Sequence, residues 1–191
     1  QLTASVAFEQ TDALSIYISP FLINRRIGVN ILRFNASFNN PAGLKAVAAY
    51  NFYSLTDQNV GNDLFFRIGR RFYEQVNIGY EYYYATYRFV PVFTDFNGIL
   101  RQYYFAPQRF DSHSLWGEYM LEKQQEYNIE IGGKIGYIPL GDAILNEGYI
   151  QANYLPMPTL TITGRIGFGS SFRFDYRYQS FSALISAYLT L

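Results

Sequence analysis

Ionisable residues recur at alternate positions along the chain, as in Arg173, Asp175 and Arg177, and this spacing places them on one face of an extended strand. Because both signs of charge are interleaved, the set could line a water-filled pore without strong ion selectivity, or form salt bridges that fill a narrow lumen. The pattern predicts one lumen-lining set: Arg67, Arg71, Glu81, Glu130, Lys134, Arg165, Arg173, Asp175 and Arg177.

His113 is the one histidine in the chain, and Ser112, Ser114 and Glu118 are near it in sequence. A Ser/His/acid set could support nucleophilic catalysis, but such a set is defined by geometry. On a strand, both serines would point away from His113. The chain also has no G-x-S-x-G motif. We therefore expect no catalytic residue and no enzyme activity, with His113 exposed at the edge of a loop.

The connection 89–113 is far longer than an ordinary hairpin loop and contains two prolines and many aromatic residues. Two interpretations stay open: a constriction or gate folded against a pore, and an ordered loop that packs on its own side chains. We expect its aromatic residues to be buried, and its arginines to pair with Glu81 or Glu130. The candidate constriction residues are Phe93, Phe96, Arg101, Tyr103, Tyr104, Phe105 and Arg109.

The elements that must position these residues are strands, because apolar and polar residues alternate with a period of two along most of the chain. Ile131 falls on the apolar phase, whereas Gly132 and Lys134 fall on the polar phase and are expected to tolerate polar replacements. A phase change near Leu32 predicts a β-bulge. Twelve strands are predicted, at 3–9, 13–19, 26–38, 44–54, 64–73, 76–88, 114–123, 127–138, 147–155, 159–168, 171–178 and 181–191.

Composition excludes several classes of protein. Lys and Arg number 15 and balance 15 Asp and Glu, so no basic face for nucleic acid is expected. The absence of Cys and the presence of one His exclude thiolate or histidine metal centres, and no metal or cofactor is expected. The longest unbroken apolar run, 46–50, is too short for a membrane-spanning helix, which needs about 20 residues.

Two all-β architectures fit the alternation. A soluble sandwich would bury its apolar face, whereas a membrane barrel would turn that face to lipid and its polar face to a lumen. Aromatic residues at the strand ends, a polar face rich in Gly, Asn, Arg and Glu, and the need to remove unpaired edges favour the barrel. The sequence thus predicts a single domain over 1–191, a transmembrane antiparallel up-and-down β-barrel of about 12 strands, within a range of 8–12. With twelve strands, the connection 89–113 would lie at the same end as both termini.

One stretch resembles a known family. An aromatic pair, a small residue, Pro-Gln, an aromatic residue and a Ser-rich strand start are similar to a stretch in the C-terminal barrels of bacterial exopolysaccharide-export porins, which join tetratricopeptide repeats to an outer-membrane barrel. The stretch is Tyr104-Phe105-Ala106-Pro107-Gln108-Arg109-Phe110-Asp111-Ser112-His113-Ser114-Leu115. The chain carries no tetratricopeptide helices, so the resemblance implies the barrel portion of such a protein or a smaller relative.

Together these patterns predict a pore or export channel in the outer membrane of a Gram-negative bacterium. The resemblance implies a neutral or weakly charged polysaccharide as cargo. The expected partners are outer-membrane lipid, a polysaccharide or small solute, and a periplasmic protein. Two alternatives remain: a closed structural or adhesive barrel without transport, and a barrel enzyme acting on lipids.

Overall fold

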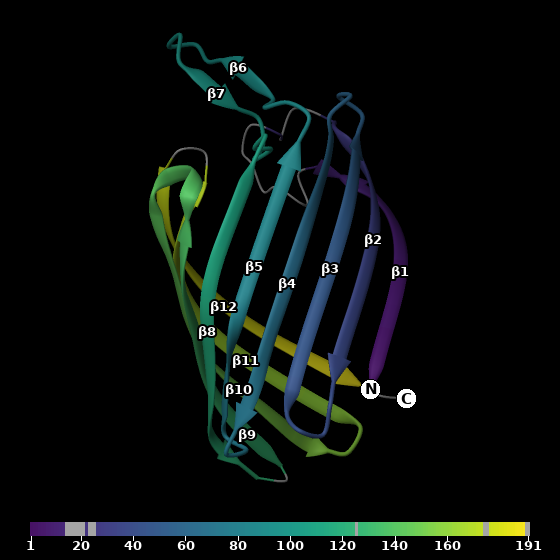
Figure 1. The fold of residues 1–191 in the computed structure, drawn as a ribbon, viewed down its shortest axis with the longest axis vertical. Helices are drawn as coiled ribbons and strands as arrows, with labels where there is room; N and C mark the ends of the chain where they lie inside the picture. The colour runs from purple at the N-terminus through teal and green to yellow at the C-terminus, as the bar shows by residue number, and fades with distance from the viewer. Residues whose placement is uncertain (14–21, 23–25, 125, 174–175, 190–191) are drawn as a thin grey trace. The chain divides into compact units, whose positions relative to one another are not determined.

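The computed structural model describes residues 1–13, 22, 26–124, 126–173 and 176–189. Ten long strands form one antiparallel sheet in which each strand pairs with the next long strand along the chain (Figure 1). These strands are β1 (Leu2–Asp12), β2 (Gly28–Asn39), β3 (Leu44–Leu55), β4 (Val60–Phe72), β5 (Val76–Tyr87), β8 (Phe110–Lys123), β9 (Tyr127–Ile138), β10 (Ala143–Met157), β11 (Leu160–Arg173) and β12 (Tyr176–Leu189). A separate two-stranded sheet contains β6 (Val92–Thr94) and β7 (Leu100–Gln102), and a short 3-10 turn, η2 (Pro139–Gly141), precedes β10.

The predicted all-β, antiparallel up-and-down class is confirmed, and ten strands fall within the predicted range. The strand order runs from β1 to β12 without a crossover. Closure of this sheet into a transmembrane barrel remains a prediction.

The strand boundaries near the C-terminus differ from those predicted. Instead of three strands over 159–191, β11 and β12 form one long hairpin whose register ends at Arg173↔Tyr176. Gly169 and Ser180, where the sequence suggested breaks, pair directly across this hairpin. Small residues at these positions continue the strands because a pleated strand accepts them without changing its alternation. Of the predicted strand 13–19, residues 14–19 lie outside the described residues.

The strand count changes the position of the long connection. Five strands, β1 to β5, precede it, so it lies at the end of the sheet opposite to the start of β1. The predicted twelve strands placed six before it, which put it at the same end as the termini. That placement is wrong because the described part of the chain forms a single strand, β1, before β2.

The chain divides into two compact units, which are described separately below. Unit 1 contains Gln1–Asn39, Ala46–Arg67 and Tyr82–Ser112, and unit 2 contains Asn40–Lys45, Ile68–Glu81 and His113–Leu191. Strands β3, β4, β5 and β8 contribute residues to both units. The expectation of a single domain over 1–191 stays a prediction.

Each unit has an apolar face and a polar face, because its strands alternate in the way the sequence indicates. In unit 2 the apolar face carries Ile131, Ile150, Ile166, Phe168 and Ile185, all of them exposed. Its polar face carries Glu81, Glu130, Lys134, Glu147 and Arg165.

In unit 1 the exposed apolar face carries Val6, Phe8, Phe34 and Leu64. The buried residues of this unit lie on the other face, where Ile31 and Val29 are fully buried.

The phase change in β2 occurs without the predicted bulge on the β1 side. The β1–β2 register runs unbroken from Leu2↔Phe38 to Asp12↔Gly28. Apolar residues instead change face, because Val29 and Ile31 belong to the buried side while Phe34 and Phe38 are exposed on the other. Shifts of register occur elsewhere, between Met120 and Glu122 against β9 and between Tyr154 and Met157 against β11.

Aromatic rings lie directly over glycines on the polar face. In unit 2 the ring of Trp116 covers Gly69 and Gly79, where an added Cβ would overlap it. The ring of Tyr149 covers Gly132 in the same way. In unit 1 the ring of Tyr87 covers Gly61. Glycine, which otherwise weakens a strand, fits at these positions because a ring takes the space that a side chain would need.

Candidate functional site

The polar face of unit 2 is built from rows of residues that the strand register places side by side across β9, β10, β11 and β12. Four successive rows are Lys134–Glu147–Gly169–Ser180, Gly132–Tyr149–Gly167–Ser182, Glu130–Gln151–Arg165–Leu184 and Asn128–Asn153–Thr163–Ser186. The first three contain charged or aromatic side chains. The last contains only amide and hydroxyl side chains and is called the uncharged row. This surface, here called the polar ladder, is the candidate functional site.

Lys134 is the centre of an ion-pair cluster in the polar ladder. Its Nζ lies 2.7 Å from Glu81 Oε1 and 3.4 Å from Glu147 Oε1. Lys134 and Glu81 are largely shielded from solvent, whereas Glu147 is half exposed. Removing the ammonium would take a charge partner from a shielded carboxylate, so the Lys134–Glu81 pair helps to fix β9 relative to β5.

Tyr149 joins opposite charges through its ring and its hydroxyl. The hydroxyl donates a hydrogen bond of 2.8 Å to Glu130 Oε1. The guanidinium carbon of Arg165 lies 3.8 Å from the ring centroid, in cation–π geometry. Gly132 beneath the ring allows it to lie flat on the sheet.

The uncharged row is connected by side-chain hydrogen bonds. Asn153 Nδ2 donates to Asn128 Oδ1 over 2.7 Å, and Thr163 Oγ1 donates to Asn153 Oδ1 over 2.7 Å. Gln151 Nε2 also donates to Asn153 Oδ1, over 3.3 Å. Amide and hydroxyl groups both donate and accept hydrogen bonds, so this row could bind an uncharged polar ligand.

The structure places six of the nine predicted lumen-lining side chains. Arg67 is half-buried and Arg71 exposed on β4. The structure brings Glu81 and Lys134 together as an ion pair, and it links Glu130 to Arg165 through Tyr149. Arg173 and Arg177 belong to β11 and β12, but their side chains, like Asp175 as a whole, lie outside the described part of the chain. Their role as a lumen lining stays a prediction.

Two polar-face residues were missed in the sequence. Glu147 shares the alternation of Tyr149, Gln151 and Asn153, and this signal could have identified it. Asp63 was missed because its strand was predicted to begin at residue 64, whereas β4 begins at Val60.

Asp63 is a buried carboxylate on the polar face of unit 1. It accepts hydrogen bonds from Asn51 Nδ2 at 2.7 Å and from the hydroxyls of Tyr53 at 2.6 Å and Tyr83 at 3.5 Å. Three donors from two strands, β3 and β5, offset the cost of burying this charge. The cluster is a structural tie within unit 1.

The connection after β5 contains an ordered β-hairpin in place of an irregular loop. In Figure 1 this hairpin, β6–β7, extends beyond the ends of β4 and β5. The rings of Phe93 and Tyr103 stack at its base with centroids 4.4 Å apart. The Asp95 carboxylate accepts hydrogen bonds from the backbone N–H groups of Ile99 and Asn97, both at 2.9 Å, and from Arg101 Nε at 3.1 Å. The hydrogen bond from Ile99 is the main reason that the pKa of Asp95 lies below its ordinary value.

A buried polar cluster fastens the base of this connection. Tyr104 and Asn59 are both 0% exposed. The Tyr104 hydroxyl donates to Asp57 Oδ2 over 2.8 Å and accepts from Asn59 Nδ2 over 2.9 Å. Asn59 Nδ2 also donates to the carbonyl of Phe89 over 3.0 Å. The β3–β4 turn is therefore bonded to both ends of the connection.

Some expectations for this connection are wrong. Arg101 pairs with Asp95 and Arg109 with Asp111, in place of the expected Glu81 or Glu130. Near neighbours in sequence outcompete distant partners because they are already within reach. Phe96 is 97% exposed at the hairpin tip, although burial was expected for the aromatic residues. Phe105 packs edge-on against Phe110, with centroids 5.2 Å apart. A constricting role for the connection stays a prediction.

His113 lies within β8 and not at a loop edge, but it is exposed as expected. Its Nδ1 is 2.6 Å from the Tyr80 hydroxyl. Ser112 and Ser114 are buried on the other side of the strand, as the alternation predicts. The hydroxyls of Ser112 and Ser114 therefore lie on the face of β8 opposite to the His113 ring, although the three residues are neighbours in sequence.

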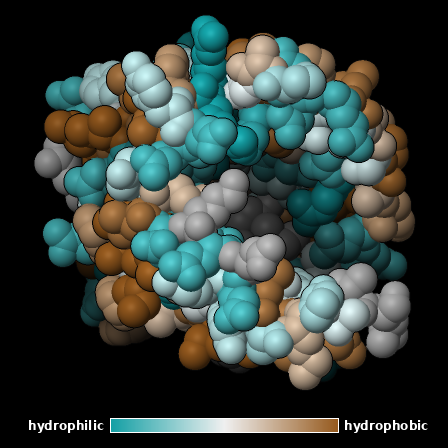
Figure 2. Space-filling model, turned by 90° about the horizontal axis from the view of Figure 1, so that it is seen from below, coloured by the Kyte–Doolittle hydropathy of each residue, from teal (hydrophilic) through white to brown (hydrophobic). Residues whose placement is uncertain are grey.

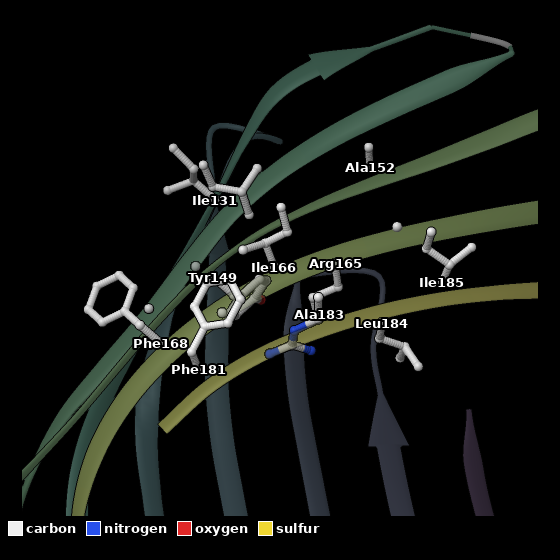
Figure 3. Close-up of a pocket in the computed structure, with 15 residues that line it drawn as sticks. Ile131, Tyr149, Ala152, Arg165, Ile166, Phe168, Phe181, Ala183, Leu184 and Ile185 are labelled. Atoms are coloured by element: carbon white, nitrogen blue, oxygen red, sulfur yellow. The ribbon is translucent and has the colours of Figure 1, made fainter. Parts of the chain in front are cut away.

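The apolar face of unit 2 carries a groove of about 810 Å³ between β9 and β12. Gly164 leaves the backbone bare there, the ring of Phe168 lies over Gly148, and Ile131, Ile166 and Phe181 surround the groove. Figure 3 shows Leu184 and Ile185 on opposite sides of β12, so that residues of both phases contribute to the lining. In Figure 2, hydrophobic patches alternate with hydrophilic residues around the face seen from below.

Two features are absent from the described residues: a membrane-spanning helix and a cluster of metal-binding side chains. No helix among them is long and apolar enough to cross a membrane. Nor do three or more His, Asp or Glu side chains in the described ranges gather in a way that could hold a metal ion.

Comparison with known proteins gives one match at the level of structure. No protein-family model matches the sequence, and no curated protein matches it. The fold is similar to that of a solved structure described as "Bacterial polysaccharide outer membrane secretin", with a TM-score of 0.73 and 8% sequence identity. The match covers 100% of this chain and 65% of that one, so the chain spans about 65% of the length of its neighbour. At this identity the likeness shows the fold alone.

Proposed function

We propose that this chain forms a β-barrel in the outer membrane of a Gram-negative bacterium and serves as an export channel for polysaccharide. The fold likeness to a polysaccharide outer membrane secretin supports this proposal. The resemblance over 104–115 supports it independently. In the structure this stretch forms the base of the long connection and the start of β8.

The observation that carries the proposal is the exposed apolar face. On β12 alone, Phe181, Ile185 and Leu189 are 75%, 84% and 64% exposed. The same phase of β9, β10 and β11 exposes Ile131, Ile150 and Ile166. A soluble monomer rarely exposes apolar area on this scale, whereas the outer surface of a membrane barrel requires it.

The polar ladder would then line the channel. Its ion pairs place both signs of charge together, so the lining has no strong field of one sign to reject or retain ions. The uncharged row offers amide and hydroxyl groups that match the hydroxyls of a neutral sugar chain. A neutral or weakly charged polysaccharide is therefore the proposed cargo.

The chain would act as the barrel portion of a larger export system. Its neighbour is longer, because the match covers 65% of that protein. Tetratricopeptide repeats, which the resembled family places in the periplasm, would be supplied by a periplasmic segment or partner. Outer-membrane lipid would contact the apolar face.

Single cysteines test this proposal, because the chain contains no natural Cys. Ser182→Cys places a thiol on the polar face of β12, and Ile185→Cys is the matched variant on its apolar face. In planar bilayers, a water-soluble thiol reagent should lower the conductance of the Ser182→Cys protein and leave the Ile185→Cys protein unchanged. Equal reaction of both thiols in membranes would show that the apolar face is in water, and the barrel proposal would fail.

A closed barrel without transport is the second candidate. The ion pairs of Lys134 and the hydrogen bonds of Asp63 favour it, because they tie strands together across the polar face. A correctly inserted, heat-modifiable protein that never conducts would support this candidate over the channel.

A further inference from the structure

A small pocket lies at the base of the β6–β7 hairpin, within unit 1. Its volume is about 320 Å³, at the lower end of the range for small-ligand sites. The pocket is lined by Asp57, Tyr103, Ile27 and the segment 89–92. An apolar wall with few polar groups is the usual composition of a ligand site. Val92 is exposed, so the pocket opens to the surface.

The aromatic wall of the pocket is held in a fixed orientation. Tyr103 stacks on Phe93 at an interplanar angle of 20°, and its backbone N–H donates to the carbonyl of Pro91 over 2.9 Å. The ring is therefore positioned without a ligand. Tyrosine combines an apolar ring with a hydroxyl, which suits the apolar C–H face and polar edge of a sugar ring.

Asp57 supplies the polar wall. Its Oδ2 accepts from the Tyr104 hydroxyl at 2.8 Å, and its Oδ1 accepts from the Asn59 backbone N–H at 3.1 Å. A carboxylate has about four acceptor positions, so both oxygens can accept further hydrogen bonds. The group accepts only, so it selects a ligand with donors, such as sugar hydroxyls. It repels a carboxylate or phosphate.

We propose that this pocket binds one residue of a neutral glycan, with Tyr103 stacking on the sugar ring and Asp57 accepting hydrogen bonds from its hydroxyls. The inference rests on the proposed function, because it places a binding subsite for the cargo at the end of the sheet opposite the start of β1, where the polysaccharide would leave the channel. Glycan binding at the channel exit would keep the emerging polymer from sliding back.

Binding of defined oligosaccharides to the whole protein in detergent micelles tests the proposal. The probes are hexamers of glucose, N-acetylglucosamine and galacturonic acid, measured by calorimetry and saturation-transfer NMR. At least one neutral hexamer should bind more tightly than the galacturonate hexamer. Tyr103→Ala should weaken that binding about tenfold, the equivalent of one lost aromatic contact, whereas Tyr103→Phe should retain most of it. Asp57→Asn should also weaken it.

Phe96→Ser, on the exposed tip of the same hairpin, is the matched control and should bind like the wild type. If neither neutral hexamer binds, if galacturonate binds best, or if Tyr103→Ala binds like the wild type, the proposal is overturned. Conductance separates this result from the proposed function. A protein that binds a neutral hexamer through Tyr103 but never conducts would keep the subsite and refute the channel, and a conducting protein without such binding would do the reverse.

Discussion

The guanidinium carbon of Arg165 lies 3.8 Å from the centroid of the Tyr149 ring, while the hydroxyl of that ring donates to Glu130. A neutral ring therefore separates a cation from an anion, and both charges are held without a direct ion pair between them. The arrangement ties β9, β10 and β11 together on the polar face.

This relationship predicts a measurable coupling between Arg165 and Tyr149. A double-mutant cycle with Arg165→Gln and Tyr149→Leu should give a coupling free energy of about 0.5–1 kcal/mol, since Arg165 is exposed and its cation–π contact is screened by solvent. Urea unfolding in lipid vesicles measures it. Arg165 and Ser186, which lie in different rows, should show no coupling. Equal coupling in both cycles would contradict the specific contact.

Gly132 should be intolerant of a side chain, contrary to the expectation from alternation alone. Gly132→Ala should destabilise the protein by about 1–3 kcal/mol, because the Tyr149 ring occupies the space of the new methyl group. Gly164→Ala is the matched control, since nothing lies within 4 Å of a Cβ there. The cost at Gly132 should shrink when Tyr149 is also changed to Ala. An equal cost at both glycines would show that strand propensity, and not the ring, is responsible.

The apolar face should reject charge if it contacts lipid. Ile131→Arg should lower the free energy of unfolding by about 2–4 kcal/mol if the residue lies near the membrane midplane. Ser182→Arg, on the polar face, introduces the same charge and should cost far less. Unfolding in vesicles compares the two variants, and a similar cost at both positions would mean that the faces are wrongly assigned.

The β6–β7 hairpin should loosen in acid. The pKa of Asp95 is lowered chiefly by the hydrogen bond from the Ile99 N–H, so the carboxylate stabilises the hairpin above the ordinary Asp pKa of about 3.9. This contribution is lost as the pH falls through the lowered pKa. Hydrogen exchange at the Ile99 and Asn97 amides should accelerate in that range after correction for intrinsic rates. The Asp95→Asn protein should not show this acid-dependent step.

Shortening the β6–β7 hairpin should show whether its tip narrows the channel or whether the connection only anchors the neighbouring strands. Replacing residues 95–99 with Asn-Gly keeps the Thr94↔Leu100 pair and should change stability little. Deleting 92–108 also removes buried Tyr104 and should cost about 3 kcal/mol or more. If the tip narrows the channel, the short replacement should raise conductance. Unchanged conductance would show that the tip does not constrict.

The sequence predicted the fold class well, because period-two alternation depends only on the geometry of a strand. It also assigned Glu81, Glu130, Lys134 and Arg165 to strands and to their polar phase. It could not show which charges pair, because pairing depends on register between strands. Lys134 reaches Glu81 from a strand more than fifty positions away.

Local competition explains the other differences. The arginines of the long connection were assigned distant partners, but Asp95 and Asp111 lie within six residues of them. Breaks were predicted near Gly169 and Ser180, where the strands continue, because small residues are equally compatible with a turn and with a continuing strand. Tyr104 and Asn59 could not be linked from sequence, since 45 positions separate them.

The ring of Trp116 over Gly69 and Gly79 has an evolutionary consequence. A methyl group at either glycine collides with the indole, and loss of the indole uncovers two bare stretches of backbone. At Gly79 the backbone carbonyl of Ile68 would also meet the methyl group, so position 79 should stay glycine among homologous sequences, whereas positions 69 and 116 should change together or not at all. Joint substitution at 69 and 116 would be a covariation signal that joins β4 and β8 without any polar contact.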